Sequence, residues 1–391
     1  MIQLEEALSI ISGFAKTKNT REKVELADSL HRVLAADVLA DTNFPSFDKS
    51  AMDGYAILKN DINKVLQIVE FIPAGKKPEK KILPGTCANI MTGAMMPEGA
   101  EMVVMNEDVV VNGNEISITN PDSKENILSQ GEDVKKGSLL LKKGTVISPA
   151  IIGLLASTGV SEPLVFKKPL ISILATGDEL VSPNEVPEPP KIRNSNSAQL
   201  CALATDSGAT TIHSSQVGDN KQLIFEAVKN SLRNSDIVVI TGGASVGDLD
   251  FTAEVFEKLE AEIHFTQIAI QPGKPALFAT IGDKFLFGLS GNPVSSFVQF
   301  QLLVKPVIQA LTGRSFEAKE IKIPITSDQK RKRAERQLFF PVKFTEKMEA
   351  EPIDYHGSAH LNAYQSADGM AYFPVGIHEI KKGTLVNVRP L

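Results

Sequence analysis

The stretch that most constrains the fold is IVVITGGASVGDLDF, residues 237–251. Residues 237–241 form a short apolar, β-branched run, which is typical of a buried parallel strand. Glycines follow at 242 and 243, where the lack of a side chain lets a ligand approach the main chain closely. Asp248 and Asp250 come next, and a helix is expected from about residue 252. Ligands of open α/β sheets bind beyond the carboxyl ends of the strands, so both carboxylates are expected near a site.

Two carboxylates with nearby backbone amides suit Mg²⁺ and phosphate better than an apolar ligand. The same residues are equally compatible with a plain strand-to-helix turn whose aspartates are solvated, because Gly and Asp are common turn residues. Without further motifs, the furthest inference from this stretch is a metal-dependent nucleotide phosphohydrolase.

The composition excludes several classes of protein. A net charge of −6 argues against a general nucleic-acid binder. The first residues, MIQLEEALSII, are acidic and lack the basic start of a secretion signal, and no apolar run is long enough to span a bilayer. Cys87 and Cys201 are isolated, and the histidines show no zinc spacing. We therefore expect a cytoplasmic protein with reduced cysteines and no membrane or nucleic-acid partner.

From residue 169 the sequence alternates between strands and helices, which predicts a doubly wound, mostly parallel α/β sheet. Each expected strand is followed by Gly, Ser, Thr, Asp or Lys, as a rim that binds phosphate and metal requires. Strands are expected at 170–175, 210–217, 237–241, 263–270 and 285–289, and helices at 198–207, 221–232 and 295–311.

The regions on either side of this α/β segment show other patterns of secondary structure. Helices are expected at residues 4–14 and 149–157, and residues 62–120 are rich in strand patterns. Beyond residue 313 the chain is all-β, with strands expected at 319–326, 337–344, 369–374 and 384–389. Between the first helix and the β-rich part lies PSFDKSAMDGYAIL, in which Asp53-Gly54 is either part of a site or a tight turn.

Seven motifs in one order now identify a family: FDKSAMDGYA, IMTGAMMPEGAEMVVMNED, QGEDVKKG, TGDEL, TGGASVGDLDF, QPGKPALF and SGNPVSS. Over nearly its whole length the chain resembles the molybdopterin molybdenumtransferases of the MoeA family, which are related to the E domain of gephyrin. The resemblance implies an enzyme of molybdenum cofactor biosynthesis. It implies that adenylylated molybdopterin and molybdate are the substrates, that AMP is released, and that Mg²⁺ takes part.

The resemblance also implies a multidomain fold and an elongated homodimer, whose site lies between the α/β domain of one subunit and the inserted domain of the other. Contacts with other proteins of molybdenum cofactor biosynthesis are expected. The implied domains are a discontinuous linker domain (residues 1–43 and 140–168), an inserted β-rich domain (44–139), an α/β molybdopterin-binding domain (169–318) and a small β-barrel-like C-terminal domain (319–391).

The site residues implied by the resemblance are carried over motif by motif. The expected catalytic residues are Asp53, Asp133, Glu179, Asp219 and Asp250, of which Glu179, Asp219 and Asp250 are also the expected Mg²⁺ ligands. The expected substrate-binding residues are Thr92, Gly242, Gly243, Ser245, Gly247, Lys274, Ser290, Gly291, Asn292, Pro293 and Ser358. The start of the helix at Pro293 suits a phosphate, and Lys274 adds a point charge.

The chain departs from the family pattern mainly in charge. Neutral residues stand where relatives are often basic, at Leu128, Gln267, Gln271 and Pro341, and Ser290 replaces a frequent proline. The alternative to an enzyme is a non-catalytic molybdopterin-binding or scaffold homologue that keeps the fold. The acidic set favours the enzyme, because a scaffold does not need six carboxylates at strand ends.

Overall fold

The computed structural model describes residues 1–18, 20–242, 248–314 and 319–391, with the backbone alone for residues 248–250. Contacts group the chain into two compact units. Unit 1 comprises residues 1–22, 31–35 and 164–391, and unit 2 comprises residues 23–30 and 36–163.

Unit 1 is built on a six-stranded sheet with the order β16-β13-β17-β21-β20-β18. All strands run parallel except β20, which is antiparallel to both of its neighbours. The mostly parallel sheet is thus confirmed. The strands are β13 (Leu170–Thr176), β16 (Thr210–Val217), β17 (Ile237–Gly242), β18 (Glu262–Gln267), β20 (Pro275–Ile281) and β21 (Lys284–Leu289).

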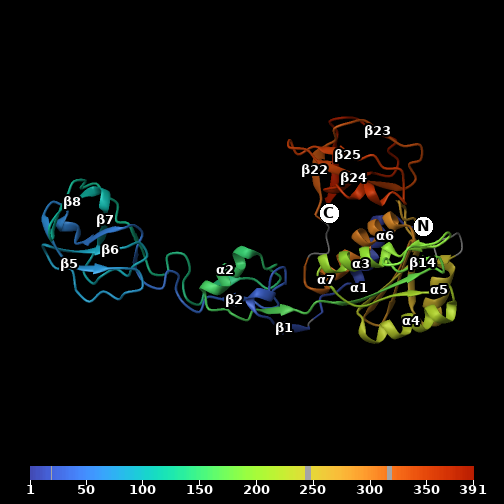
Figure 1. Cartoon of the computed structure of the whole chain (residues 1–391), viewed down its shortest axis with the longest axis horizontal. Coiled ribbons are helices and arrows are strands. Elements are labelled where there is room, and N and C mark those ends of the chain that lie inside the picture. Colours follow the sequence, from blue (N-terminus) through green and yellow to red (C-terminus); the bar gives the residue numbers. More distant parts are fainter. Residues whose placement is uncertain (19, 243–247, 315–318) are drawn as a thin grey trace. The chain divides into compact units, whose positions relative to one another are not determined.

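Helices cover both faces of this sheet, because alternate strand residues point to opposite sides. Ile237 and Val239 face a core shared with α1, α3, α6 and α7, whereas Val238 and Ile240 face a core shared with α4 and α5. Figure 1 shows the two helical layers on either side of the sheet. The helices are α1 (Leu4–Phe14), α3 (Ser195–Asp206), α4 (Lys221–Asn234), α5 (Asp248–Lys258), α6 (Pro293–Gln299) and α7 (Lys305–Leu311), with a π-helical turn at Phe300–Val304 between the last two.

Three predictions for this sheet need correction. The strand expected at 263–270 is divided into β18 and β19 (Ile270–Gln271), and the helix expected from residue 252 begins at Asp248. Strand β20 was not expected; it forms a hairpin with β21 through Gly282 and Asp283. The reason is that an unbroken apolar run such as PALFATI carries no alternation that would distinguish a central strand from other buried segments.

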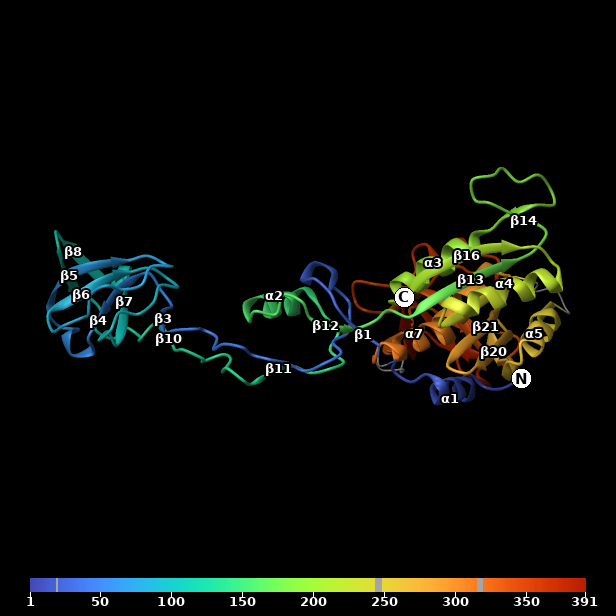
Figure 2. The same cartoon turned by 90° about the horizontal axis from the view of Figure 1, so that it is seen from below.

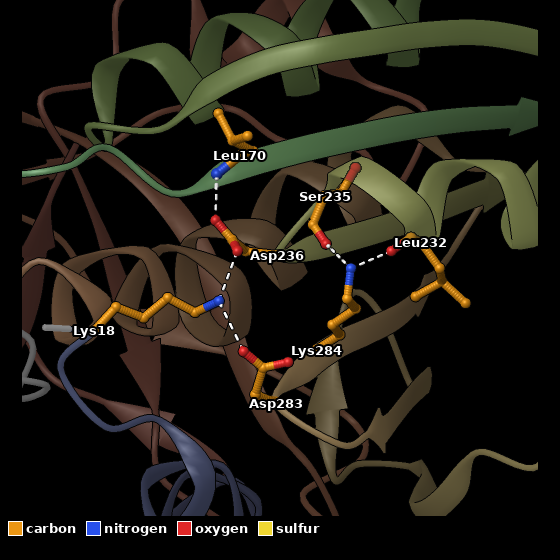
Figure 3. Close-up of polar contacts among 7 residues, drawn as sticks. All are labelled: Lys18, Leu170, Leu232, Ser235, Asp236, Asp283 and Lys284. Atoms are coloured by element: carbon orange, nitrogen blue, oxygen red, sulfur yellow. Dashed lines mark hydrogen bonds and ion pairs between the residues drawn. The ribbon is translucent and has the colours of Figure 1, made fainter. Parts of the chain in front are cut away.

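The amino edge of the sheet is held by an ion-pair network (Figure 3). Asp236, just before β17, accepts hydrogen bonds from the amide of Leu170 at 2.7 Å and from the Lys18 ammonium at 2.6 Å. The same ammonium lies 3.1 Å from Asp283 in the β20–β21 hairpin. Lys18 therefore connects the chain that follows α1 to the start of β17 and to the β20–β21 hairpin.

The C-terminal part of unit 1 is an antiparallel sheet with the order β24-β26-β28-β22, and β25 pairs with β24. An isolated bridge between Ile325 and Ala350 connects the β22 end to β25. The small barrel-like form of this domain stays a prediction. The strands are β22 (Ile321–Pro324), β24 (Gln337–Phe344), β25 (Ala350–Pro352), β26 (Gly369–Phe373) and β28 (Leu385–Pro390), with β19 added beside β24 and a separate pair formed by β23 (Gln329–Lys330) and β27 (Glu379–Ile380).

Unit 2 contains a six-stranded sheet with the order β7-β4-β6-β5-β9-β8, which agrees with the predicted β-rich region. Unit 2 also contains two short strand pairs, and α2 (Pro149–Ser157) matches the predicted helix. The sheet consists of β4 (Gly54–Ile57), β5 (Val65–Ile72), β6 (Thr86–Ile90), β7 (Met102–Met105), β8 (Val109–Asn112) and β9 (Glu115–Ile118), and the pairs are β2 (Val38–Leu39) with β11 (Leu139–Leu141) and β3 (Lys49–Ser50) with β10 (Ile127–Leu128).

The remaining elements are short strands and 3₁₀ turns. They are β1 (Arg21–Lys23), β12 (Leu164–Phe166), β14 (Leu180–Val181), β15 (Ile192–Arg193) and the 3₁₀ turns Leu26–Asp28, Lys59–Asp61, Asn106–Asp108 and Leu361–Tyr364. Figure 2 shows the loop between β14 and β15 projecting beyond the sheet of unit 1.

Two features bear on earlier expectations. Leu4, Ala7 and Ile11 of α1 pack in the same core as the central sheet, so the first helix groups with the α/β domain rather than with a linker segment 1–43. The four-domain division otherwise stays a prediction.

The stretch Pro293–Leu311 has the length and composition of a membrane span, but 78% of it is buried inside unit 1, as in the core helix of a globular protein.

Candidate functional site

The expected site residues of unit 1 gather at the carboxyl edge of the sheet. Strands β13 and β16 end side by side, with Thr176 opposite Val217. Beyond them, the amide of Asp178 donates to the Asp219 carboxylate at 3.2 Å, and the amide of Asp219 donates to the Asp178 carboxylate at 3.1 Å. This reciprocal pair holds the TGDEL turn against the loop after β16.

Glu179 belongs to the same edge. A Cβ atom at Gly177 would lie 2.6 Å from a carboxylate oxygen of Glu179, so this side chain folds back over the end of β13. The structure thus brings the loops of Glu179 and Asp219 together. That both carboxylates bind one cation stays a prediction. Carboxylate oxygens are the ligands that Mg²⁺ prefers, so this donor chemistry fits the expected cation.

Gly242 lies at the point where the strand order changes direction, between β13 and β17. It is paired with Thr176 and has a φ of +117°. A Cβ atom there would lie 2.0 Å from the Thr176 carbonyl oxygen, so only glycine fits this close approach. Ligands of doubly wound sheets bind at such a switch point.

The next part of the predicted site lies outside the described residues: Gly243, Ser245 and Gly247. Asp250 lies in the first turn of α5, so it follows the loop on a helix rather than within the loop. Among the residues that the structure describes, no group of three or more His, Cys, Asp or Glu side chains is placed to hold a metal. The expected trio Glu179, Asp219 and Asp250 stays a prediction, because the described part does not extend to the Asp250 side chain.

The SGNP segment follows β21 and is anchored by buried side chains. The Thr241 hydroxyl donates to the Ser290 carbonyl at 2.9 Å, and the Asn196 amide donates to the Gly291 carbonyl at 2.8 Å. The same Asn196 nitrogen lies 3.0 Å from the Thr241 hydroxyl. The carboxyl ends of β17 and β21 and the start of α3 are therefore tied together around Ser290 and Gly291.

Asn292 and Pro293 begin α6, and Ser358 is brought to the same place from the C-terminal domain. The carbonyl of Ser358 accepts a hydrogen bond from the amide of Val294 at 3.1 Å. One amide of the helix start, which we expected to be free for phosphate, is therefore bonded to Ser358. Lys274 lies in the turn between β19 and β20, at the edge where Gln267 pairs with Pro275.

Asp53 and Thr92, which belong to unit 2, form a compact pair. One carboxylate oxygen of Asp53 accepts hydrogen bonds from both the hydroxyl and the amide of Thr92, each at 2.6 Å. These bonds hold the pKa of the exposed Asp53 carboxyl below its usual value, because they stabilise the charged form. Asp53 is thus a preorganised anion beside a hydroxyl.

The tight-turn alternative for Asp53-Gly54 is wrong. Gly54 is the first residue of β4, paired with Ile90 and Met105 on the two neighbouring strands. A Cβ atom at Gly54 would lie 2.0 Å from the Val104 carbonyl oxygen, so the glycine permits close strand packing.

Asp133 lies on the chain that returns from β10. Its amide donates to the Phe44 carbonyl at 3.1 Å, and the nearby Gln130 amide donates to the Asp48 carboxylate at 2.6 Å. The FDKSAMDGYA and QGED motifs are therefore neighbours in space, and Asp48 connects them.

Sequence reasoning missed four polar residues that organise these loops: Asp178, Asn196, Thr241 and Gln299. Thr241 and Gln299 are fully buried, and Asn196 is 9% exposed. A polar residue inside an apolar run, such as Gln299 in VSSFVQFQLLV, is the signal that could have indicated them. Their partners could not be inferred, since these come from distant parts of the chain.

Three regions of the chain match family models. They are described as the MoeA N-terminal region, domains I and II (residues 2–159), a probable molybdopterin-binding domain (residues 172–310) and the MoeA C-terminal region, domain IV (residues 324–391). The chain belongs to the MoeA family. The predicted resemblance is confirmed, and the three matched regions together extend from the first helix to the last strand.

Curated MoeA relatives have the same name in several organisms. A Staphylococcus epidermidis molybdopterin molybdenumtransferase is 34% identical over 399 residues, which cover 99% of this chain and 95% of the relative. A Bacillus subtilis molybdopterin molybdenumtransferase is 40% identical over 320 residues, which cover 79% of this chain and 74% of the relative.

Solved MoeA structures have the same fold. A molybdopterin biosynthesis MoeA protein from Pyrococcus horikoshii OT3 aligns with a TM-score of 0.86 at 29% identity and covers 100% of both chains. A second structure of a P. horikoshii MoeA protein aligns with a TM-score of 0.83 at 32% identity, covering 100% of this chain and 99% of the other.

Proposed function

We propose that this MoeA family member is a molybdopterin molybdenumtransferase of molybdenum cofactor biosynthesis. It takes adenylylated molybdopterin and molybdate, releases AMP and leaves molybdenum on the pterin dithiolene. The relatives that match most of the chain are named for this transfer. The observation that carries the proposal for this chain is the convergence of Glu179, Asp219, Gly242 and Ser290 at one edge of the sheet.

The chain's own residues bind and orient the substrate. The Gly291 amide and Lys274 receive the phosphates, because an N–H and an ammonium group stabilise negative oxygens. The neighbouring amides of Ser290, Asn292 and Val294 already donate to Gln299, Ser290 and Ser358. Asp53 is held ionised by Thr92 and presents a fixed negative charge and an ordered hydroxyl neighbour. Thr241 and Asn196 fix the segment that carries Ser290 and Gly291.

Mg²⁺ fits the oxygen donors of the acidic edge, with Glu179, Asp219 and Asp250 as its proposed ligands. When bound, it supplies positive charge that neutralises phosphate oxygens and so favours cleavage of the phosphoanhydride. The reciprocal hydrogen bonds of Asp178 and Asp219 keep the donor loops in position without the cation.

We further propose a homodimer in the cytoplasm that shares each site between subunits and contacts other proteins of the pathway. The support from this chain is α2, whose sequence PAIIGLLAS is apolar on every side. A helix of that kind is normally buried all round, but Leu155 alone is fully buried in α2. A second copy of the chain is the proposed cover for the remaining apolar residues.

The test is incubation of the purified protein with adenylylated molybdopterin, Mg²⁺ and molybdate, following AMP release and the formation of active cofactor. We expect both products, and neither after Mg²⁺ is removed by a chelator. Binding of the nucleotide ligand without AMP release would overturn the enzyme and support the scaffold alternative.

A further inference from the structure

Gln299 is a fully buried polar residue in the core of unit 1. It ends α6, lies between Val298 and Phe300, and has no exposed surface. A buried carboxamide is costly unless its donors and acceptor are all satisfied. Its partners therefore indicate why a polar side chain occupies this position.

The Gln299 side chain connects two loops of the candidate site. Its oxygen accepts a hydrogen bond from the Ser290 amide at 2.8 Å, in the SGNP segment. Its nitrogen donates to the carbonyls of Gly273 at 2.9 Å and Pro275 at 2.5 Å, on either side of Lys274. Because carbonyl groups only accept and an amide N–H only donates, just one orientation of the carboxamide satisfies all three bonds.

The Lys274 turn is shaped around this side chain. Gly273 has a φ of +103°, and a Cβ atom there would lie 2.9 Å from the Gln299 Cγ atom. Lys274 itself is connected to the end of β18, because its carbonyl accepts from the Ile268 amide at 3.0 Å. The backbone on both sides of Lys274 is thus fixed, whereas its exposed ammonium group has no hydrogen-bond or ion-pair partner among the residues that the structure describes.

We propose that Gln299 is a positioning residue that sets Lys274 at a fixed distance from the Ser290–Pro293 segment, so that both contact the same phosphate group. This inference rests on the proposed function, since the phosphate contact of Lys274 belongs to it. This positioning also requires a residue with an N–H at position 290, because a proline there would have no N–H to donate to Gln299.

The variant Gln299→Glu distinguishes the bond to Ser290 from the bonds to Gly273 and Pro275. The carboxylate still accepts from the Ser290 amide, but its second oxygen faces the Gly273 and Pro275 carbonyls and repels them. Gln299→Met keeps the volume and removes all three bonds. Gln301→Glu is the matched control, because Gln301 is half-buried two residues further along the same helical stretch and lies outside this network.

The first measurement is amide hydrogen exchange of the free protein, which tests positioning without any ligand. In Gln299→Glu we expect faster exchange of peptides covering residues 267–276, little change at residues 288–294, and wild-type exchange in Gln301→Glu. In Gln299→Met both segments should exchange faster. Unchanged exchange of residues 267–276 in a folded Gln299→Glu or Gln299→Met variant would overturn the positioning role.

The second measurement is a double-mutant cycle on AMP binding with Mg²⁺ present. We expect Gln299→Glu to weaken binding about 10-fold, because part of the roughly 10- to 100-fold contribution of the Lys274–phosphate contact is lost. In a Lys274→Ala background the same change should cost less than about 2-fold. If the two substitutions reduce the affinity for AMP additively, Gln299 does not act through Lys274. If the wild-type protein does not bind AMP, the result counts against the proposed function itself.

Discussion

At the scale of single residues, Asp53 and Thr92 of unit 2 form a short polar contact between two expected site residues. The hydroxyl and amide of Thr92 both donate to one carboxylate oxygen and hold the pKa of Asp53 below its usual value. Because this pKa is depressed in the folded protein, the bonds stabilise the fold above the unfolded pKa. That stabilisation is lost as pH falls through the folded pKa.

We predict that Thr92→Val raises the pKa of Asp53, since the hydroxyl donor is lost and the amide donor remains. An NMR titration of the Asp53 carboxyl carbon measures the change. Thr119→Val, at an exposed threonine of the same unit, is the control and should leave the titration as in the wild type. An Asp53 titration that does not move in Thr92→Val would contradict the role of the hydroxyl.

Lys274 is the cation expected to compensate for neutral residues at Gln267 and Gln271. A charge-assisted contact to phosphate contributes roughly 1.5–3 kcal/mol. We therefore predict that Lys274→Ala weakens binding of adenylylated molybdopterin by about 10- to 100-fold in calorimetric titration. Gln271→Lys should strengthen binding and make it more sensitive to salt. Lys229→Ala, on the exposed side of α4, is the control, and unchanged affinity in Lys274→Ala would mean that Lys274 only caps its turn in solvent.

Asp250 follows the glycine-rich loop in the first turn of α5. We predict that Asp250→Ala keeps the fold and the dimer but loses most Mg²⁺-dependent turnover, because a carboxylate ligand of the cation is removed. AMP release at saturating Mg²⁺ measures this. Glu254→Ala, four residues further along the same helix, should retain activity, and near-normal release by folded Asp250→Ala would refute the assignment.

At the scale of elements, the amino edge of the sheet in unit 1 depends on Lys18 (Figure 3). Burial opposes the charge of Lys18, but the hydrogen bonds and charges of Asp236 and Asp283 outweigh it and raise the pKa of Lys18. The bond from Lys18 in turn lowers the pKa of Asp283. Both Lys18 and Asp236 are only about a quarter exposed, at 24% and 23% of their side chains.

We predict that Lys18→Met lowers the free energy of unfolding by about 1–3 kcal/mol near neutral pH, because Asp236 loses a charged partner. Urea unfolding with Lys16→Met as an exposed control measures the loss. The raised pKa of Lys18 means that its stabilisation is present below the unfolded pKa and lost as pH rises through the folded pKa. The lowered pKa of Asp283 means that its share is lost as pH falls. A stability difference that is the same at all pH values would contradict the network.

At the scale of the whole molecule, the proposed sharing of each site between subunits makes a quantitative prediction. A mixed dimer of one Asp53→Ala chain and one Asp250→Ala chain contains one intact site and one site lacking both carboxylates. We therefore expect about half the wild-type activity per dimer from two chains that are inactive by themselves. Activity measured on tagged, purified mixed dimers tests this, and an active monomer in sedimentation at assay concentration would exclude the shared site.

Much of the fold could be predicted because its signals are local. The helices expected at 4–14 and 149–157 and the strands expected at 210–217 and 337–344 agree with α1, α2, β16 and β24 to the residue. Each of these segments carries either helical periodicity or a bounded strand pattern with turn residues at its ends. The TGDEL and QPGKPALF motifs likewise placed Glu179 and Lys274 beyond strand ends, and the expected strand at 210–217 placed Asp219 there.

The sequence by itself determined which segments form strands and helices and which loops carry charge, since side-chain periodicity and turn residues act over a few positions. Tertiary structure decided what depends on distant partners. The antiparallel direction of β20 comes from its pairing with β21 and β18. The need for glycine at 54 and 242 comes from carbonyls on neighbouring strands. The polar Gln299 acquires its role from Ser290 and Gly273, because hydrogen bonds between remote segments exist only after the sheet has brought those segments together.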